Sequence, residues 1–167
     1  IGLDHWNPTD EFASAEIGVV ENSTASYKSN IVFNTRDTSA NVKATEKVRI
    51  THDGNIGVGT TEPAVQSAGR GIHIHDTTPS EIKFTNDTTE STATDGTALV
   101  LNSNSFTINN REVGDLFFST SNTQRMQILY QGDVRIKGNT NDNLFYTDFS
   151  ADRIGIGTDS PDTLLHV

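Results

Sequence analysis

Two histidines separated by one residue are the feature of this sequence best suited to chemistry. His73 and His75 flank Ile74, and side chains two residues apart lie on one face of a strand. Three chains around one axis would then bring six imidazoles together, an octahedral set suited to iron or nickel. In the alternative, Ile72 and Ile74 face inward and both histidines face outward. His166, at the place equivalent to His73, has no second histidine, so we assign no metal site.

A glycine-rich segment, with Gly54, Gly57 and Gly59, invites comparison with phosphate-binding loops. The order of the glycines does not fit a dinucleotide fingerprint, and no strand–helix–strand pattern surrounds it. A calcium loop fails as well, because the twelfth residue from Asp53 is Ala64 where a bidentate Glu is needed. The segment is therefore predicted to be a turn, and no cofactor is expected.

Acidic pairs such as Asp10 and Glu11 raise the possibility of a polysaccharide hydrolase, which uses two carboxylates. Adjacent residues of a strand point to opposite faces, so sequence neighbours do not form such a pair. The GxSxG signature of a nucleophile elbow is also missing from the sequence,. We predict no catalytic residues and no enzymatic activity.

Four aromatic residues could present rigid contact area to a sugar or a surface protein: Trp6, Tyr27, Phe145 and Tyr146,. The favoured interpretation is structural, with these rings capping a core or filling an interface between chains. Trp6 is the most open case, because it lies outside the repeated segments described below.

The composition indicates an ordered chain with a small core. Hydrophobic residues make up 33% of the 167 residues, and the 13 glycines raise this to about 41%, below the 45–50% usual for globular domains. The chain has no cysteine and a net charge of −10, and its pI is near 4.7. This charge argues against nucleic-acid binding, and the apolar runs are too short for membrane insertion.

Apolar residues alternate with polar ones along most of the chain, which predicts short strands with one dry face. Asp-Gly and similar turn sequences separate them, so the fold class is all-β, with residues 9–15 as the one weak helical possibility. The alternating pairs are Val48/Ile50, Ile56/Val58, Ile72/Ile74, Ile82/Phe84, Leu99/Leu101, Phe106/Ile108, Leu116/Phe118, Met126/Ile128, Val134/Ile136, Leu144/Tyr146, Ile154/Ile156 and Leu165/Val167.

The sequence also repeats internally. With an offset of 78, residues 47–56 match residues 125–134, and with an offset of 98, residues 56–63 match residues 154–161. Repeats of this kind indicate an elongated architecture whose units cannot bury their own apolar faces alone. The second copy departs from the others, because Arg135 and Lys137 stand where the other copies have glycines. That turn is expected to pack less closely on an axis.

A single copy of the chain is predicted to be barely stable. Burying one Val, Leu or Ile stabilises by roughly 1.5–3 kcal/mol, whereas ordering costs about 1–2 kcal/mol per backbone residue. Identical strands meeting around a three-fold axis would supply a shared core and cover the strand edges. Gly57 and Gly59 leave one strand face bare, which would let a neighbouring chain approach closely.

The recurring phrases resemble the shaft repeats of bacteriophage tail fibres, of the kind that precede an intramolecular chaperone domain. The family's typical phrases, ERMRI…GNVGIGT.P…LHV, correspond here to residues 46–50, 54–60, 63 and 165–167. Companion segments are similar at residues 15–17, 31–35, 76–80, 82–86, 110–112 and 114–118. The resemblance implies a homotrimer on a phage fibre, although similar repeats also occur in bacterial surface proteins.

On this basis we divide the chain into an N-terminal connector (1–12), a first fibre repeat (13–64), a linker (65–71), a second repeat (72–138) and a partial third repeat (139–167). The expected architecture is elongated, repetitive β-structure, either a triple β-helix or a β-prism, formed as an intertwined homotrimer. The glycines expected at turns and close approaches are Gly54, Gly57, Gly59, Gly155 and Gly157. The residues expected in the trimer core are Val48, Ile50, Ile56, Val58, Met126, Ile128, Val134, Ile136, Ile154 and Ile156.

The expected function is that of a non-enzymatic structural segment of a trimeric tail fibre that supports host attachment. Its expected partners are two further copies of itself, other fibre or baseplate segments, and a host cell-surface receptor, and its expected location is the virion. The alternative is a receptor- or glycan-binding module of a fibre or of a bacterial surface adhesin.

Overall fold

The structure is a computed structural model that describes residues 2–3, 13–21, 28–66 and 69–167. Within these ranges all regular secondary structure is β, with no helix, which confirms the all-β prediction. Trp6, Tyr27 and the Asp10/Glu11 pair lie outside the described residues, as does part of the possible helix at 9–15.

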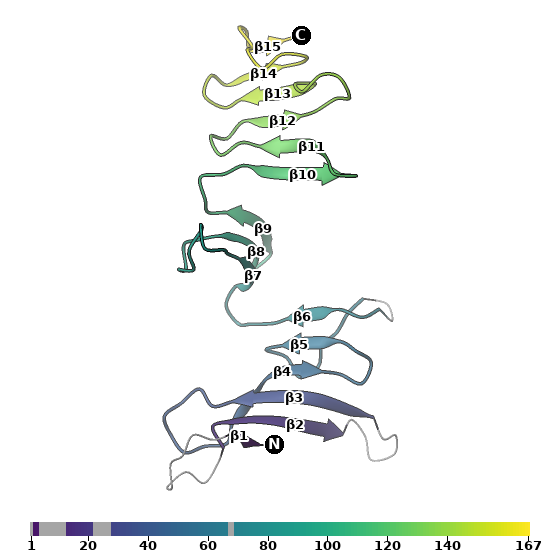
Figure 1. Ribbon diagram of the computed structural model, residues 1–167, viewed down its shortest axis with the longest axis vertical. Coiled ribbons are helices and arrows are strands. Elements are labelled where there is room, and N and C mark those ends of the chain that lie inside the picture. The colour runs from purple at the N-terminus through teal and green to yellow at the C-terminus, as the bar shows by residue number, and fades with distance from the viewer. Residues whose placement is uncertain (1, 4–12, 22–27, 67–68) are drawn as a thin grey trace. The chain divides into compact units, whose positions relative to one another are not determined.

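The first sheet has six strands that follow one another in chain order (Figure 1). Each strand pairs antiparallel with the next, except that β5 and β6 pair parallel. The strands are β1 (Gly2–Leu3), β2 (Ala15–Glu21), β3 (Ser29–Thr35), β4 (Thr45–Ile50), β5 (Ile56–Val58) and β6 (Ile72–Ile74).

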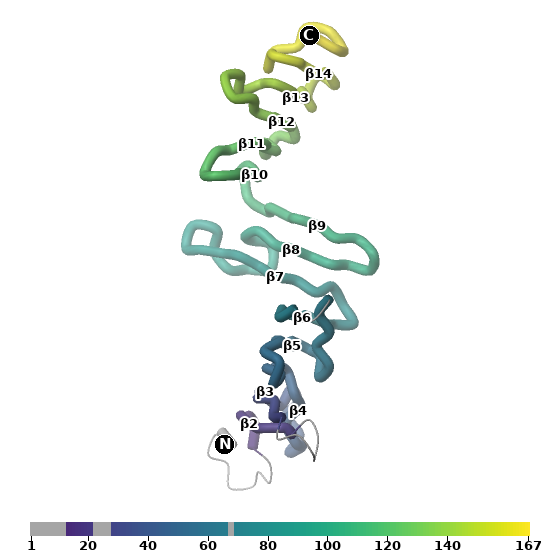
Figure 2. The backbone as a smooth tube through the Cα atoms, turned by 90° about the vertical axis from the view of Figure 1, so that its right-hand side faces the viewer, coloured from purple at the N-terminus to yellow at the C-terminus, as the bar shows by residue number. Residues whose placement is uncertain are grey.

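A second six-stranded sheet is built in the same way, and its last pair, β14 and β15, is again parallel. Its strands are β10 (Leu116–Thr120), β11 (Thr123–Ile128), β12 (Val134–Ile136), β13 (Phe145–Asp148), β14 (Arg153–Gly155) and β15 (Leu165–His166). Between the two sheets in sequence, β7 (Ser80–Phe84), β8 (Thr97–Asn102) and β9 (Ser105–Asn110) form a three-stranded sheet. Figure 2 follows the backbone through all three.

The chain divides into two units. One consists of Ile1–Glu81 and Leu101–Ser105, and the other of Ile82–Val100 and Phe106–Val167. The first six-stranded sheet belongs to the former and the second to the latter.

The turns that precede β5 and β12 have the same geometry, as the sequence repeat predicts. Gly54 has a φ of +86° and Gly132 a φ of +110°, values that residues other than glycine rarely adopt. The Gly54 amide donates to the Thr51 carbonyl and the Gly132 amide to the Leu129 carbonyl, both at 2.9 Å. The offset of 78 residues therefore corresponds to a repeated local structure.

A β-bulge recurs at equivalent positions of the sequence repeat, once in each six-stranded sheet. The register shifts after the Phe33–Val48 pair in the first sheet, and after the Phe118–Met126 pair in the second. The extra residues are Lys47 and Arg125. The Lys47 carbonyl accepts from the Gly59 amide, and the Arg125 carbonyl accepts from the Lys137 amide, both at 2.9 Å, so the bulge is fixed by the strand that follows.

The strand positions agree closely with the alternating apolar pairs. Leu144 lies one residue before β13, while Ile156 and Val167 each lie one residue after their strands. The other predicted pairs fall within strands. Short strands fray at their ends, so such one-residue differences are expected.

Few apolar side chains are buried in the described part of the chain. The buried hydrophobic residues are Val32, Ala44, Ala98 and Tyr146, and no large side chain is fully enclosed. A globular domain of this length ordinarily buries a continuous core. Most of the Val, Leu, Ile and Phe side chains must therefore contribute to surfaces of the single chain.

Candidate functional site: two apolar sheet faces

One face of the first sheet consists of two unbroken rows of apolar side chains. Residues paired directly across strands lie on the same face. The first row is Ile17, Phe33, Val48, Val58 and Ile74, and the second is Val19, Ile31, Ile50, Ile56 and Ile72. Val19 is 69% exposed and Ile72 is 63% exposed, so this face has no sufficient cover among the described residues of the chain.

The second sheet repeats this arrangement. One row is Phe118, Met126, Ile136 and Phe145, and the other is Leu116, Ile128, Val134, Thr147, Ile154 and Leu165. Thr147 is the one polar member, and its hydroxyl accepts a hydrogen bond from the Val134 amide at 2.8 Å. Leu165 is 60% exposed. We call these surfaces, one on each six-stranded sheet, the apolar faces.

Nine of the ten residues predicted for a shared core lie in these rows. The tenth, Ile156, follows β14 directly and is two residues beyond Ile154, so it continues the alternation. Most are half-buried in the single chain, with Ile136, Ile154 and Ile156 slightly more exposed. The structure brings the predicted residues together as two surfaces, one on each sheet.

The sequence interpretation missed the contributions of β2 and β3 to the apolar face. Ile17 and Val19 alternate in β2, and Ile31 and Phe33 alternate in β3. This period-two alternation is visible in the sequence and would have predicted both strands. Pairing with β4 adds these four side chains to the face, and they are among its most exposed members.

The opposite face of the first sheet, which we call its polar face, carries the buried Val32 beside polar groups that pair with one another. Arg49 lies beside Gly57 in the strand ladder, and its guanidinium donates to both carboxylate oxygens of Glu46 at 2.7 Å. This hydrogen bonding raises the pKa of Arg49 above its usual value. At the equivalent positions of the second sheet, the Gln124 side-chain amide donates to Gln127 at 3.0 Å. Each pair therefore satisfies polar groups within its own sheet.

Tyr146 is the buried centre of the polar face of the second sheet. Its hydroxyl donates to Asp133 Oδ2 at 2.6 Å, and the Arg135 guanidinium lies 5.4 Å from its ring centroid. Burial, together with the Asp133 carboxylate, raises the pKa of Tyr146 to about 12. Because Tyr146 is buried and its neighbour Phe145 belongs to the apolar face, these two residues do not form a platform for a sugar.

The predicted glycines occupy positions where a side chain does not fit. Gly59 and Gly157 have φ values of +73° and +83°. A Cβ at Gly57 would lie 2.7 Å from the Thr60 carbonyl oxygen, and one at Gly155 would lie 2.3 Å from that of Thr158. The bare backbone at these two sites is therefore occupied by the following turn of the same chain, whereas the sequence interpretation assigned it to a neighbouring chain.

His73 lies in β6 on the polar face of the first sheet, and His75 is the first residue after that strand. His73 pairs with Gly57 in the ladder, and its Nδ1 accepts a hydrogen bond from the Ala64 amide at 3.1 Å. The His73 and His75 rings meet edge to face, with centroids 6.1 Å apart. Within the described ranges, no group of three or more His, Asp or Glu side chains is arranged to hold a metal ion.

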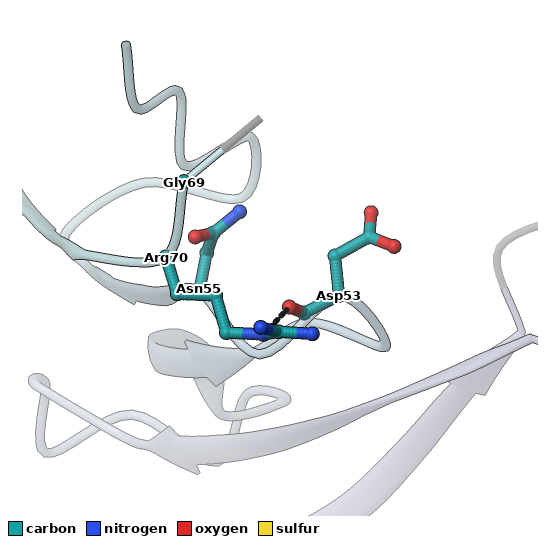
Figure 3. A pocket seen from close by; sticks show the side chains of 4 residues that line it. All are labelled: Asp53, Asn55, Gly69 and Arg70. Carbon is teal, nitrogen blue, oxygen red and sulfur yellow. Dashed lines mark hydrogen bonds between the residues drawn. The ribbon is translucent and has the colours of Figure 1, made fainter. Parts of the chain in front are cut away.

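An open hollow beside the β4–β5 turn is lined by Asp53, Asn55, Gly69 and Arg70 (Figure 3). Arg70 Nε donates to the Asp53 carbonyl oxygen at 2.8 Å, and Asn55 Oδ1 accepts from the Gly71 amide at 3.1 Å. The Asp53 carboxylate points away from Arg70 (Figure 3). These groups hold the turn, and they do not converge on a position that a reacting atom could occupy.

No protein-family model, curated protein or solved structure matches this chain. Among the described residues there is no helix long and apolar enough to cross a bilayer. The apolar faces are thus the feature of the structure from which a function has to be inferred.

Proposed function

We propose that the chain is a non-enzymatic structural segment of a homotrimeric bacteriophage tail fibre. In this proposal three copies bury their apolar faces against one another, forming an intertwined β-prism or triple β-helix in the virion. The segment supports attachment to the host by linking other fibre or baseplate parts to a receptor-binding region.

The observation that carries the proposal is the pair of apolar faces. Ten Val, Ile and Phe side chains of the first sheet remain half-buried or exposed in the single chain. Completing their burial would stabilise the sheet by on the order of 10 kcal/mol, which is as large as the whole stability of a typical domain. Monomeric proteins rarely expose contiguous apolar surfaces of this kind.

We favour identical copies of the chain as the partners that cover these faces, because a similar apolar face occurs twice within one chain. In both sheets the strands follow chain order, one strand pair contains the bulge, and one strand pair is parallel. A cyclic arrangement of equal subunits covers every copy of such a face in the same way. The resemblance of residues 46–63 and 152–167 to tail-fibre shaft repeats further supports three copies.

The alternative proposal is a receptor- or glycan-binding module of a fibre or of a bacterial surface adhesin. It is favoured by aromatic rings that lie outside the rows and are exposed, namely Tyr130 at 58% and Phe149 at 68%. Exposed rings are common in recognition surfaces. In this alternative, the fragment itself recognises the host.

Light scattering coupled to size exclusion tests the main proposal. Three chains of 18.1 kDa each give an expected mass of three times that value, and a stable monomer would contradict it. Binding of the same sample to a glycan array or to whole cells separates the two functions: a trimer that binds neither is a passive segment, and specific binding supports the recognition module.

A further inference from the structure

One position of the repeated phrase differs between the copies, and this difference coincides with a difference in topology. Gly57 follows Ile56 and Gly155 follows Ile154, and in both cases the next strand is added in parallel. In the middle copy Arg135 follows Val134, and the next strand, β13, is added antiparallel. The three positions are equivalent under the offsets of 78 and 98 residues.

A parallel strand can be added here only because the chain crosses back over the sheet. Residues 60–64 and 158–162, which we call straps, lie over the polar face directly above the glycines. The Thr60 carbonyl oxygen would be 2.7 Å from a Cβ at Gly57, and the Thr158 carbonyl oxygen 2.3 Å from one at Gly155. Backbone atoms cannot move aside as the end of a flexible side chain can, so any side chain here displaces the strap.

Each strap is held by the same set of hydrogen bonds. The Thr60 hydroxyl accepts from the Glu62 amide at 3.2 Å, and the Thr158 hydroxyl accepts from the Ser160 amide at 3.1 Å. At the far end, His73 Nδ1 accepts from the Ala64 amide, and His166 Nδ1 accepts from the Asp162 amide at 3.4 Å. The first histidine of the His-Ile-His segment, His73, thus has a structural counterpart in His166.

The middle copy has no room for a strap. Arg135 pairs with Tyr146 in the ladder, and its guanidinium packs over the tyrosine ring. Lys137 replaces the glycine that has positive φ in the other copies. The chain instead turns back through a tight connection in which the Gly138 amide donates to the Asn141 carbonyl at 2.7 Å, and the sheet continues.

We infer that glycine at this position, together with the positive-φ glycine two residues later, determines whether a sheet is continued or receives a strapped parallel strand. Glycine admits the strap, and a side chain forces an antiparallel return. In the first sheet the strapped strand β6 is the last one, and the chain then enters the sheet formed by β7, β8 and β9. The position of the glycine in the repeat therefore sets how many strands a sheet contains.

Hydrogen–deuterium exchange of the full chain carrying Gly155→Ala tests this inference. The expected result is exchange accelerated by about tenfold or more in β14, the strap and β15, through local opening, with β2–β4 unchanged. Gly114→Ala is the matched control, because its Cβ would meet nothing closer than Asn110 Nδ2 at 3.7 Å, and it should leave all exchange unchanged.

Three results would overturn the inference. Unchanged exchange at Ile156 and Asp162 in Gly155→Ala would show that a side chain is compatible with the strap. Equal acceleration in Gly114→Ala would show that the effect is not specific to the position. Acceleration throughout β2–β4 as well would show that Gly155 is needed for the entire fold and does not act locally.

Discussion

Replacing Ile56 by Asp places a carboxylate in the centre of the apolar face of the first sheet. Ile56 lies between Ile50 and Ile72 in its row, and it is half-buried in the single chain. In one chain alone the new carboxylate would remain in contact with water. In the proposed trimer, the same change would bring three carboxylates into the shared core.

The expected cost can be estimated from sheet geometry. With packed sheets about 10 Å apart and an effective dielectric constant of about 20, each pair of charges repels by roughly 1.7 kcal/mol, or about 5 kcal/mol for three pairs. Loss of apolar burial adds about 1 kcal/mol per chain. The total of roughly 8 kcal/mol weakens assembly by about six orders of magnitude.

Sedimentation velocity and far-ultraviolet circular dichroism measure this effect. We expect Ile56→Asp to sediment as a single chain with reduced β-sheet signal, because the isolated chain lacks sufficient core. Val42→Asp is the matched control, since Val42 is 44% exposed and lies in the β3–β4 connection outside the rows, and it should assemble normally. A fully folded trimer of Ile56→Asp would refute the assignment of this face to a shared core.

Three further predictions concern the polar faces. Because the raised pKa of Tyr146, about 12, exceeds the usual value near 10, its protonated form contributes stability that is complete below about pH 10 and is lost as pH rises toward 12. Ultraviolet titration should show an ionisation near pH 12 that is absent in Tyr146→Phe, and titration curves of the two proteins that do not differ there would contradict this. Glu46→Gln leaves Arg49, whose side chain is 14% exposed, without its ion pair, and it should lower the free energy of unfolding by about 1–3 kcal/mol. The double variant Glu46→Gln/Arg49→Gln should recover part of this loss, because it can form the amide pair seen at Gln124 and Gln127. Urea unfolding measures both, and a double variant less stable than the single one would count against this. His73→Ala removes the acceptor of the Ala64 amide, so it should lower the stability measured by thermal unfolding by about 0.5–1.5 kcal/mol. His75→Ala is the control, and equal effects of the two variants would argue against the strap contact.

The alternation of apolar residues was sufficient to predict the strands from β4 onward, whereas β2 and β3 were missed. Pairs such as Met126/Ile128 and Val134/Ile136 have period two, and Gly132, in the turn between them, supplies the positive φ that the turn requires. The offsets of 78 and 98 residues predicted that the copies share local structure, and the repeated bulge at Lys47 and Arg125 follows from the same sequence similarity. These features are local, so they are visible in the sequence.

Contacts between distant residues could not be predicted in the same way. The sequence places a glycine at position 57 but does not say why, and only the path of the strap shows that Thr60 fills the space above it. Arg135 was expected to weaken packing around an axis, whereas its side chain packs over Tyr146 on the face opposite the apolar rows. The side on which a loop returns depends on tertiary structure, and alternation alone does not specify it.

Covalent footprinting of aliphatic side chains in solution tests the central claim most directly. Val19 and Ile72 are 69% and 63% exposed in the single chain, and Val113, outside the rows, is 86% exposed. If further copies cover the apolar faces, carbene labelling of the assembled protein should modify Val113 strongly and leave Val19 and Ile72 protected. Labelling of all three in proportion to their exposure in the single chain would contradict the account.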